Sequence, residues 1–117
     1  MGKRDIQLKK GVIDILILKL LSREKMYGYR LLQELDNKSN GVFKMKEGTL
    51  YPVLYRLEDE GFITSLWEEP DRDISGKRSV PRKYYKITKN GKDELRNLIN
   101  DLKNITNAIS LVLNEDI

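Results

Sequence analysis

The chain has 117 residues, of which 34% are charged, with a net charge of +4 and neither cysteine nor histidine. This length fits one domain with a modest core, and the basic balance permits a nucleic-acid or anionic-membrane partner. The composition excludes disulfides, thiol nucleophiles, imidazole bases and the usual zinc or copper ligands, so we expect no enzyme activity, no metal site and no cofactor.

The first predicted helix runs from about Leu8 to Leu21 and is apolar around most of its circumference. Asp14 and Lys19 interrupt its apolar stretch, which has about half of the roughly 20 residues that a membrane span needs. No small-residue cleavage site follows it, so we expect no signal peptide and a cytoplasmic protein without a membrane partner. A helix this apolar must be buried on several sides, and we expect part of it to face a second subunit.

Two more helices are predicted before the first strand. The earlier one runs from about Gly28 to Lys38 and is followed by a break at residues 40 and 41. The later one ends at Gly61, because glycine tolerates the positive φ that often terminates a helix. One apolar stripe at the helical spacing i, i+3, i+4 and i+7 marks its buried face: Leu50, Val53, Leu54 and Leu57.

Two strands at residues 62–67 and 82–88 follow, joined by a polar loop over residues 68–81. Trp67 is expected to anchor the first strand by packing on the sheet, and Tyr84 and Tyr85 should point to opposite faces. Four cations with no acid among them cluster in the loop and the second strand: Lys77, Arg78, Arg82 and Lys83. They predict phosphate contact, whereas the plainer alternative is a solvated loop whose charges only keep the protein soluble.

The last helix is predicted from an N-cap at Thr88 to about Leu113. Apolar residues recur within it in an a/d heptad register: Leu95, Leu98, Leu102, Ile105, Ile109 and Val112. This register favours a homodimer joined through the helix, while the alternative is a helix packed on its own domain.

Three sequence runs occur in order along the chain: MYGYRLLQEL at 26–35, GTLYPVLYRLEDEGFI at 48–63 and RKYYKITKNGK at 82–92. With these runs the chain closely resembles the PadR family of bacterial transcriptional regulators. The resemblance implies a mainly α fold with a small β-hairpin wing, namely a winged helix-turn-helix plus a C-terminal dimerisation helix. The expected units are residues 1–90, which bind DNA, and residues 91–117, which form the dimer.

A helix amino terminus favours phosphate, so we expect the start of the third helix to meet double-stranded DNA. Lys46 stands where the family often has a serine cap, which exchanges capping for charge. The alternative for Thr49 and the tyrosines is ordinary surface and packing. With the four wing cations, the predicted DNA contacts are Lys44, Lys46, Gly48, Thr49, Tyr51, Tyr55 and Arg56.

The resemblance also implies a repressor at a pseudo-palindromic operator, and some relatives bind flat aromatic molecules between the first and last helices. Residues 95–109 contain no aromatic side chain, so a stacking pocket is not expected here. A small-molecule effector site could involve four residues that equally well fit an interface core: Ile15, Lys19, Leu98 and Leu102. The alternative function is a winged-helix adaptor that binds another protein and never engages DNA.

Overall fold

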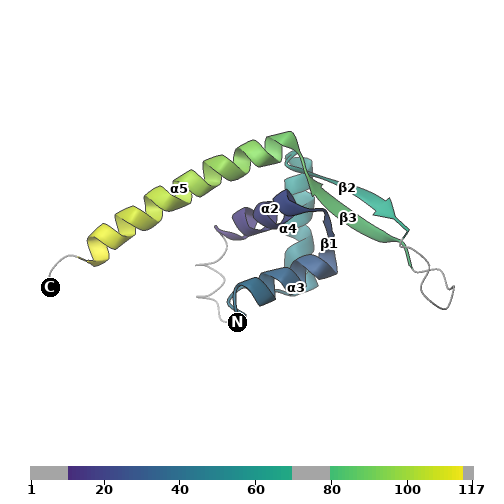
Figure 1. The fold of residues 1–117 in the computed structure, drawn as a ribbon, viewed down its shortest axis with the longest axis horizontal. Helices are drawn as coiled ribbons and strands as arrows, with labels where there is room; N and C mark the ends of the chain where they lie inside the picture. The colour runs from purple at the N-terminus through teal and green to yellow at the C-terminus, as the bar shows by residue number, and fades with distance from the viewer. Residues whose placement is uncertain (1–10, 70–79, 115–117) are drawn as a thin grey trace.

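The computed structural model describes residues 11–69 and 80–114. Its elements in chain order are α2 (Ile13–Arg23), β1 (Met26–Tyr27), α3 (Gly28–Lys38), α4 (Glu47–Asp59), β2 (Ile63–Glu68), β3 (Arg82–Ile87) and α5 (Lys89–Leu113). Helices α2, α3 and α4 form a cluster from which the β2–β3 hairpin and α5 extend in opposite directions (Figure 1). In the described part of the chain, the helices lack the length and continuous apolar character that crossing a bilayer demands.

The core forms where the apolar faces of the helices meet the sheet. Three residues of the α4 stripe, Leu50, Leu54 and Leu57, are at most 1% exposed, which confirms the predicted dry face of this helix. Six apolar residues of α2 are also buried within the single chain. These six side chains are covered by α3, β3 and α5, which contact this helix. The expectation that part of the helix faces a second subunit stays a prediction.

A tight junction joins the end of α4 to the start of α5. Gly61 has φ +80°, and the Phe62 N–H donates to the Leu57 carbonyl, so α4 ends as predicted and the chain turns into β2. The Thr88 hydroxyl donates to the Gly61 carbonyl and accepts from the Gly91 N–H, which confirms Thr88 as the N-cap of α5. A Cβ on Gly91 would lie 2.0 Å from the Phe62 carbonyl oxygen, so only glycine fits this approach.

The sheet is antiparallel and has the strand order β1-β3-β2. Strand β1 was not predicted, because two residues before a helix carry no readable alternation. Tyr85 is buried and Tyr84 only half-buried, which confirms that they occupy opposite faces. The prediction for Trp67 is wrong: its side chain is 70% exposed, because the outer part of the hairpin extends beyond the helices that cover the inner part (Figure 1).

Helix α5 has two unlike halves. Leu95 is buried and Leu98, Ile99 and Leu102 are partly buried against the same core, so the first half packs on the chain itself. The second half projects away from the body, and the molecule is 66 Å long as a result (Figure 1). Its apolar residues remain exposed in the single chain, with exposed fractions of 57% at Ile105, 49% at Ile109 and 68% at Val112.

Candidate nucleic-acid interface

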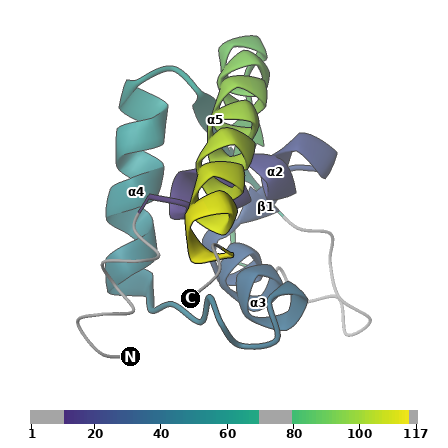
Figure 2. The ribbon, with the colours of Figure 1, turned by 90° about the vertical axis from the view of Figure 1, so that its left-hand side faces the viewer.

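Helix α4 lies on one flank of the molecule, with one side turned outward (Figure 2). Its first turn is exposed at Glu47, Gly48 and Thr49. Lys46 is the N-cap and makes no side-chain capping hydrogen bond, while its carbonyl accepts from the N–H groups of Thr49 and Leu50. The first turn of a helix leaves N–H groups without intrahelical partners, so this end offers donors and a positive dipole to an anion.

Two lysines lie at this end of α4. The side chains of Lys44 and Lys46 are both exposed, one in the segment before the helix and one at its cap. Gly48 has nothing within 4 Å of the position that a Cβ would occupy, so a phosphodiester strand could approach the backbone closely there. Glu47 contributes one opposing carboxylate in the same turn. The local balance of cations, hydroxyl and free N–H groups suits phosphate binding.

The two tyrosines of α4 differ in their surroundings. Tyr51 is half-buried and packs against the start of α3, where a Cβ on Gly28 would lie 2.4 Å from its hydroxyl oxygen. Burial raises the pKa of Tyr51, and the Glu47 carboxylate raises it further. Tyr55 is 51% exposed, with its ring centroid 6.1 Å from that of Tyr51. Tyr55 is therefore the side chain of this pair that presents a large flat surface to a ligand.

The wing strand β3 approaches the exposed side of α4. The ammonium of Lys83 lies 5.8 Å from the ring centroid of Tyr55 and 5.7 Å from that of Tyr85, within the range of a cation–π contact. Lys83 thus places a positive charge beside α4, and the first turn of α4, Tyr55 and Lys83 border one surface. Arg82 lies on the other face of the sheet, 4.5 Å above the ring centroid of Tyr27. Lys77 and Arg78 lie outside the described residues.

Arg56 points away from this surface toward α2. Its guanidinium donates to the Asp14 carboxylate at 2.6 Å and to the Glu60 carboxylate at 2.9 Å. These two hydrogen bonds raise the pKa of Arg56, so it stays fully charged and already paired. A guanine contact would require the side chain to give up both partners.

The four residues expected at an effector site differ in their surroundings in the single chain. Ile15 is buried in the core, and Leu98 and Leu102 pack partly against it from α5. Lys19 instead borders an apolar groove of about 280 Å³ between α2 and α3, whose lining includes none of the other three. The apolar residues that line this groove are Leu16, Leu20, Leu35 and Phe43.

Comparison with known proteins identifies the family. A model of the transcriptional regulator PadR-like family matches residues 17–97, which run from within α2 to the first part of α5. The chain belongs to the PadR family. It is a transcriptional regulator of this family, and its winged-helix fold is that of solved PadR structures.

Among PadR-family structures, that of a regulator from Eggerthella lenta superimposes with a TM-score of 0.77 at 31% identity, covering 95% of this chain and 89% of that one. A PadR-like regulator from Bacillus cereus gives 0.76 at 29% identity, covering 94% and 99%. In sequence, protein X of Lysinibacillus sphaericus is 36% identical over 89% of this chain and 90% of its own length. The negative transcriptional regulator PadR of Bacillus subtilis is 32% identical over 72% of this chain and 43% of its own length.

Proposed function

We propose that this PadR-family chain is a homodimeric, sequence-specific DNA-binding repressor that occupies a pseudo-palindromic operator. The observation that carries the proposal is the shared surface of α4 and β3. The exposed first turn of α4 and the exposed ring of Tyr55 lie on one helix, and the Lys83 ammonium lies over that ring. A duplex lying against α4 would therefore meet a helix amino terminus and a wing cation together.

In this arrangement the start of α4 enters a major groove. Lys44, Lys46 and the hydroxyl of Thr49 contact phosphates and fix the position of the helix. Tyr55 lies two turns further along and supplies a flat surface and a phenol donor for base edges or a thymine methyl. Lys83 and the wing cations Lys77 and Arg78 neutralise a neighbouring phosphate strand. Arg82 is left out of this contact, because it lies on the other face of the sheet over the ring of Tyr27. Arg56 is left out of this contact set, because Asp14 and Glu60 hold its guanidinium.

The second half of α5 supplies the dimer contact. Its exposed aliphatic stripe, Ile105, Ile109 and Val112, continues the register of residues that already pack on the core. Pairing two such stripes buries apolar surface that one chain leaves in water. Two α4 helices would then face successive major grooves about 34 Å apart on one side of the duplex. Repression is inferred from the Bacillus subtilis relative, whose name describes a negative regulator.

Electrophoretic retention of the DNA upstream of the protein's own gene, measured across a series of salt concentrations, tests DNA binding. We expect log affinity to fall linearly with log salt in the wild type. Lys46→Ala and Lys83→Ala should each weaken binding and reduce the slope by about 1, because each removes one phosphate contact. Lys86→Ala is the matched control, since Lys86 is exposed on β3 but faces the opposite side of the sheet from Lys83.

Two results would count against the proposal. Absence of retention, or retention that does not respond to salt, would favour the adaptor that binds another protein. Equal loss of affinity in the Lys86→Ala control would show that general charge, and not this surface, attracts the duplex.

A further inference from the structure

Trp67 is a large apolar side chain that neither the core nor the proposed contact set uses. It is the only tryptophan of the chain, it lies near the end of β2, and it is 70% exposed. Single exposed apolar residues are common on protein surfaces, so exposure alone assigns no role. The position of this residue relative to β3 and α4 carries the inference.

The strand register places Trp67 on the side of the sheet that faces α4. Trp67 pairs with Lys83 across the antiparallel β2–β3 ladder, and paired residues project from the same face. Lys83 in turn extends its ammonium over the ring of Tyr55 on α4. Tyr85, two residues further along β3, is buried on this same face. Trp67 therefore continues the surface that contains Tyr55 and Lys83, at the point where the hairpin passes beyond the helices.

The charges around Trp67 distinguish the two faces of the hairpin. Its neighbour Glu68 projects from the opposite face, where the carboxylate accepts a hydrogen bond from the Lys25 ammonium. The charged side chain paired with Trp67 on the inner face is Lys83. Glu69, exposed just after the strand and two residues from Trp67 in the chain, adds one negative charge that disfavours a phosphate at this end of the strand. With a cation paired across the ladder and an acid at this end of the strand, the indole therefore suits an apolar part of DNA, such as the sugar, better than a phosphate group.

We propose that Trp67 packs its indole against deoxyribose at the edge of the minor groove, next to the phosphate strand that Lys83 contacts. This inference rests on the proposed DNA-binding function. Packing against the sugar removes apolar surface of the indole from water, as happens to aromatic side chains at the centre of interfaces. The contact involves no charge, so it adds affinity without releasing counterions.

Two substitutions separate this contact from the charge contacts. Trp67→Ala should weaken binding to the upstream duplex about ten- to thirtyfold while leaving the salt slope unchanged, and Trp67→Phe should retain part of the affinity. Leu66→Ala is the matched control, because Leu66 is adjacent on β2 but projects from the opposite face. Leu66→Ala should bind as the wild type does. The thermal midpoint of every variant, measured alongside, shows whether it is folded.

The wild-type protein provides a second readout that needs no variant. Because Trp67 is the only tryptophan, all indole fluorescence reports on this position. We expect acrylamide to quench it readily in the free protein and less efficiently when the upstream duplex is added. Unchanged quenching in a saturated complex, or wild-type affinity of a folded Trp67→Ala variant, would overturn the role of Trp67 alone. Failure of the wild type to bind duplex DNA would instead overturn the proposed function, and this contact with it.

Discussion

Changing Ile105 and Ile109 together to aspartate should abolish the proposed homodimer. About half of each side chain is exposed in the single chain, with fractions of 57% and 49%. Complete burial of an isoleucine is worth about 1.5–3 kcal/mol, so burying the exposed half contributes about 1 kcal/mol. Two residues on each of two protomers then contribute about 4 kcal/mol, which corresponds to about three decades in the dimer dissociation constant.

The same exposed fractions make this pair a better choice than Leu102, which is partly buried against the core of its own chain. Aspartate at Leu102 would weaken the fold as well as the dimer, whereas aspartate at Ile105 and Ile109 meets water in the monomer. Sedimentation velocity should show a monomer, and circular dichroism should show that it remains helical. Loss of the dimer should also weaken operator binding, because two half-sites are no longer held together.

The control places the same two charges on the other side of the helix. Asn104 and Asn107 are exposed and occupy outer positions of the heptad register, so Asn104→Asp with Asn107→Asp should remain a dimer. A double aspartate variant at Ile105 and Ile109 that sediments as a dimer with the wild-type dissociation constant would refute dimerisation through this stripe of α5. Equal dissociation of both double variants would attribute the effect to charge on α5 and not to the stripe.

Three further predictions concern the fold around the interface. Burial raises the pKa of Tyr85 to about 12, so the folded chain holds this proton after the unfolded chain loses it near pH 10. Stability is then fully present below pH 10 and falls by about 1.4 kcal/mol per pH unit toward pH 12. Tyr85→Phe should remove this slope in urea titrations, and a slope retained by the variant would contradict the assignment. Gly91→Ala should lower the thermal midpoint strongly, because the new Cβ would meet the Phe62 carbonyl at 2.0 Å, and an unchanged midpoint would show that the junction relaxes freely. Arg56→Ala should leave DNA affinity within about twofold and cost at most about 1 kcal/mol of unfolding free energy, since the pairs to Asp14 and Glu60 are partly exposed. A large loss of DNA affinity would instead identify Arg56 as a base reader.

Tyr85→Phe also tests the packing beneath the interface. Among the described residues, the Tyr85 hydroxyl is the buried side-chain polar atom that lacks a hydrogen-bond partner. A buried hydroxyl without a hydrogen-bond partner lowers the free energy of unfolding by about 1–3 kcal/mol, so removing it should raise this free energy at neutral pH. A clear loss of stability in the phenylalanine variant would show that this hydroxyl has a partner in solution.

The fold followed from the sequence where local signals were strong. The period of the α4 stripe, the positive φ of Gly61 and the cap at Thr88 each depend on a few neighbouring residues, and each was predicted correctly. Strand β1 was missed because its two residues gain their conformation from pairing with Tyr84 and Tyr85, far along the chain. Such a partner leaves no local pattern.

The candidate site depended more on tertiary structure. Strand alternation places Trp67 on the inner face of the sheet, but only the fold shows that the helices end before they reach it. The sequence likewise identified Arg56 of α4 as a candidate DNA contact and contained no sign that Asp14, 42 positions away, accepts its hydrogen bond. Proximity in space between charges of distant segments decides which cations remain available to a partner.

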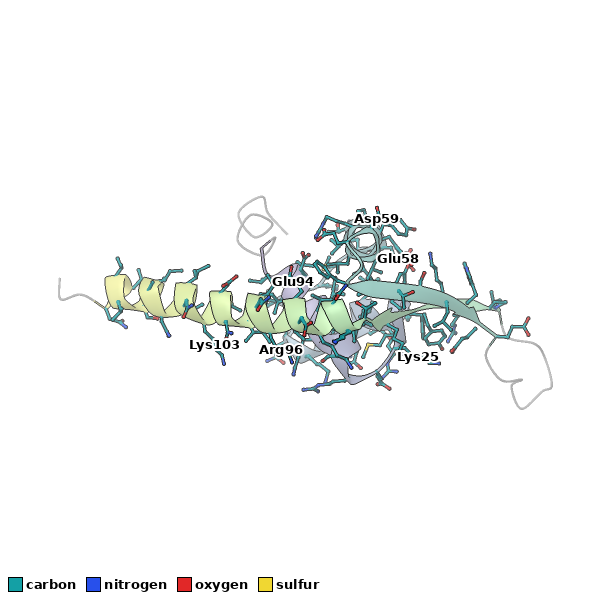
Figure 3. All side chains as sticks on the ribbon, turned by 90° about the horizontal axis from the view of Figure 1, so that it is seen from above. Lys25, Glu58, Asp59, Glu94, Arg96 and Lys103 are labelled. Atoms are coloured by element: carbon teal, nitrogen blue, oxygen red, sulfur yellow. The ribbon has the colours of Figure 1, made fainter. Side chains whose placement is uncertain are left out.

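Helix α5 and the hairpin leave the helical body in opposite directions, while the end of α4, at Glu58 and Asp59, lies to one side of that line (Figure 3). The first turn of α5 is fixed to the turn that follows α4 by the hydrogen bonds of Thr88 and by the close approach of Gly91 to the Phe62 carbonyl. In a homodimer held through the outer half of α5, the orientation of this helix would set the orientation of α4, because the two helices are joined at that turn. In the proposed complex, a small change in the angle between the two α5 helices would therefore move both α4 amino termini relative to the grooves of the operator.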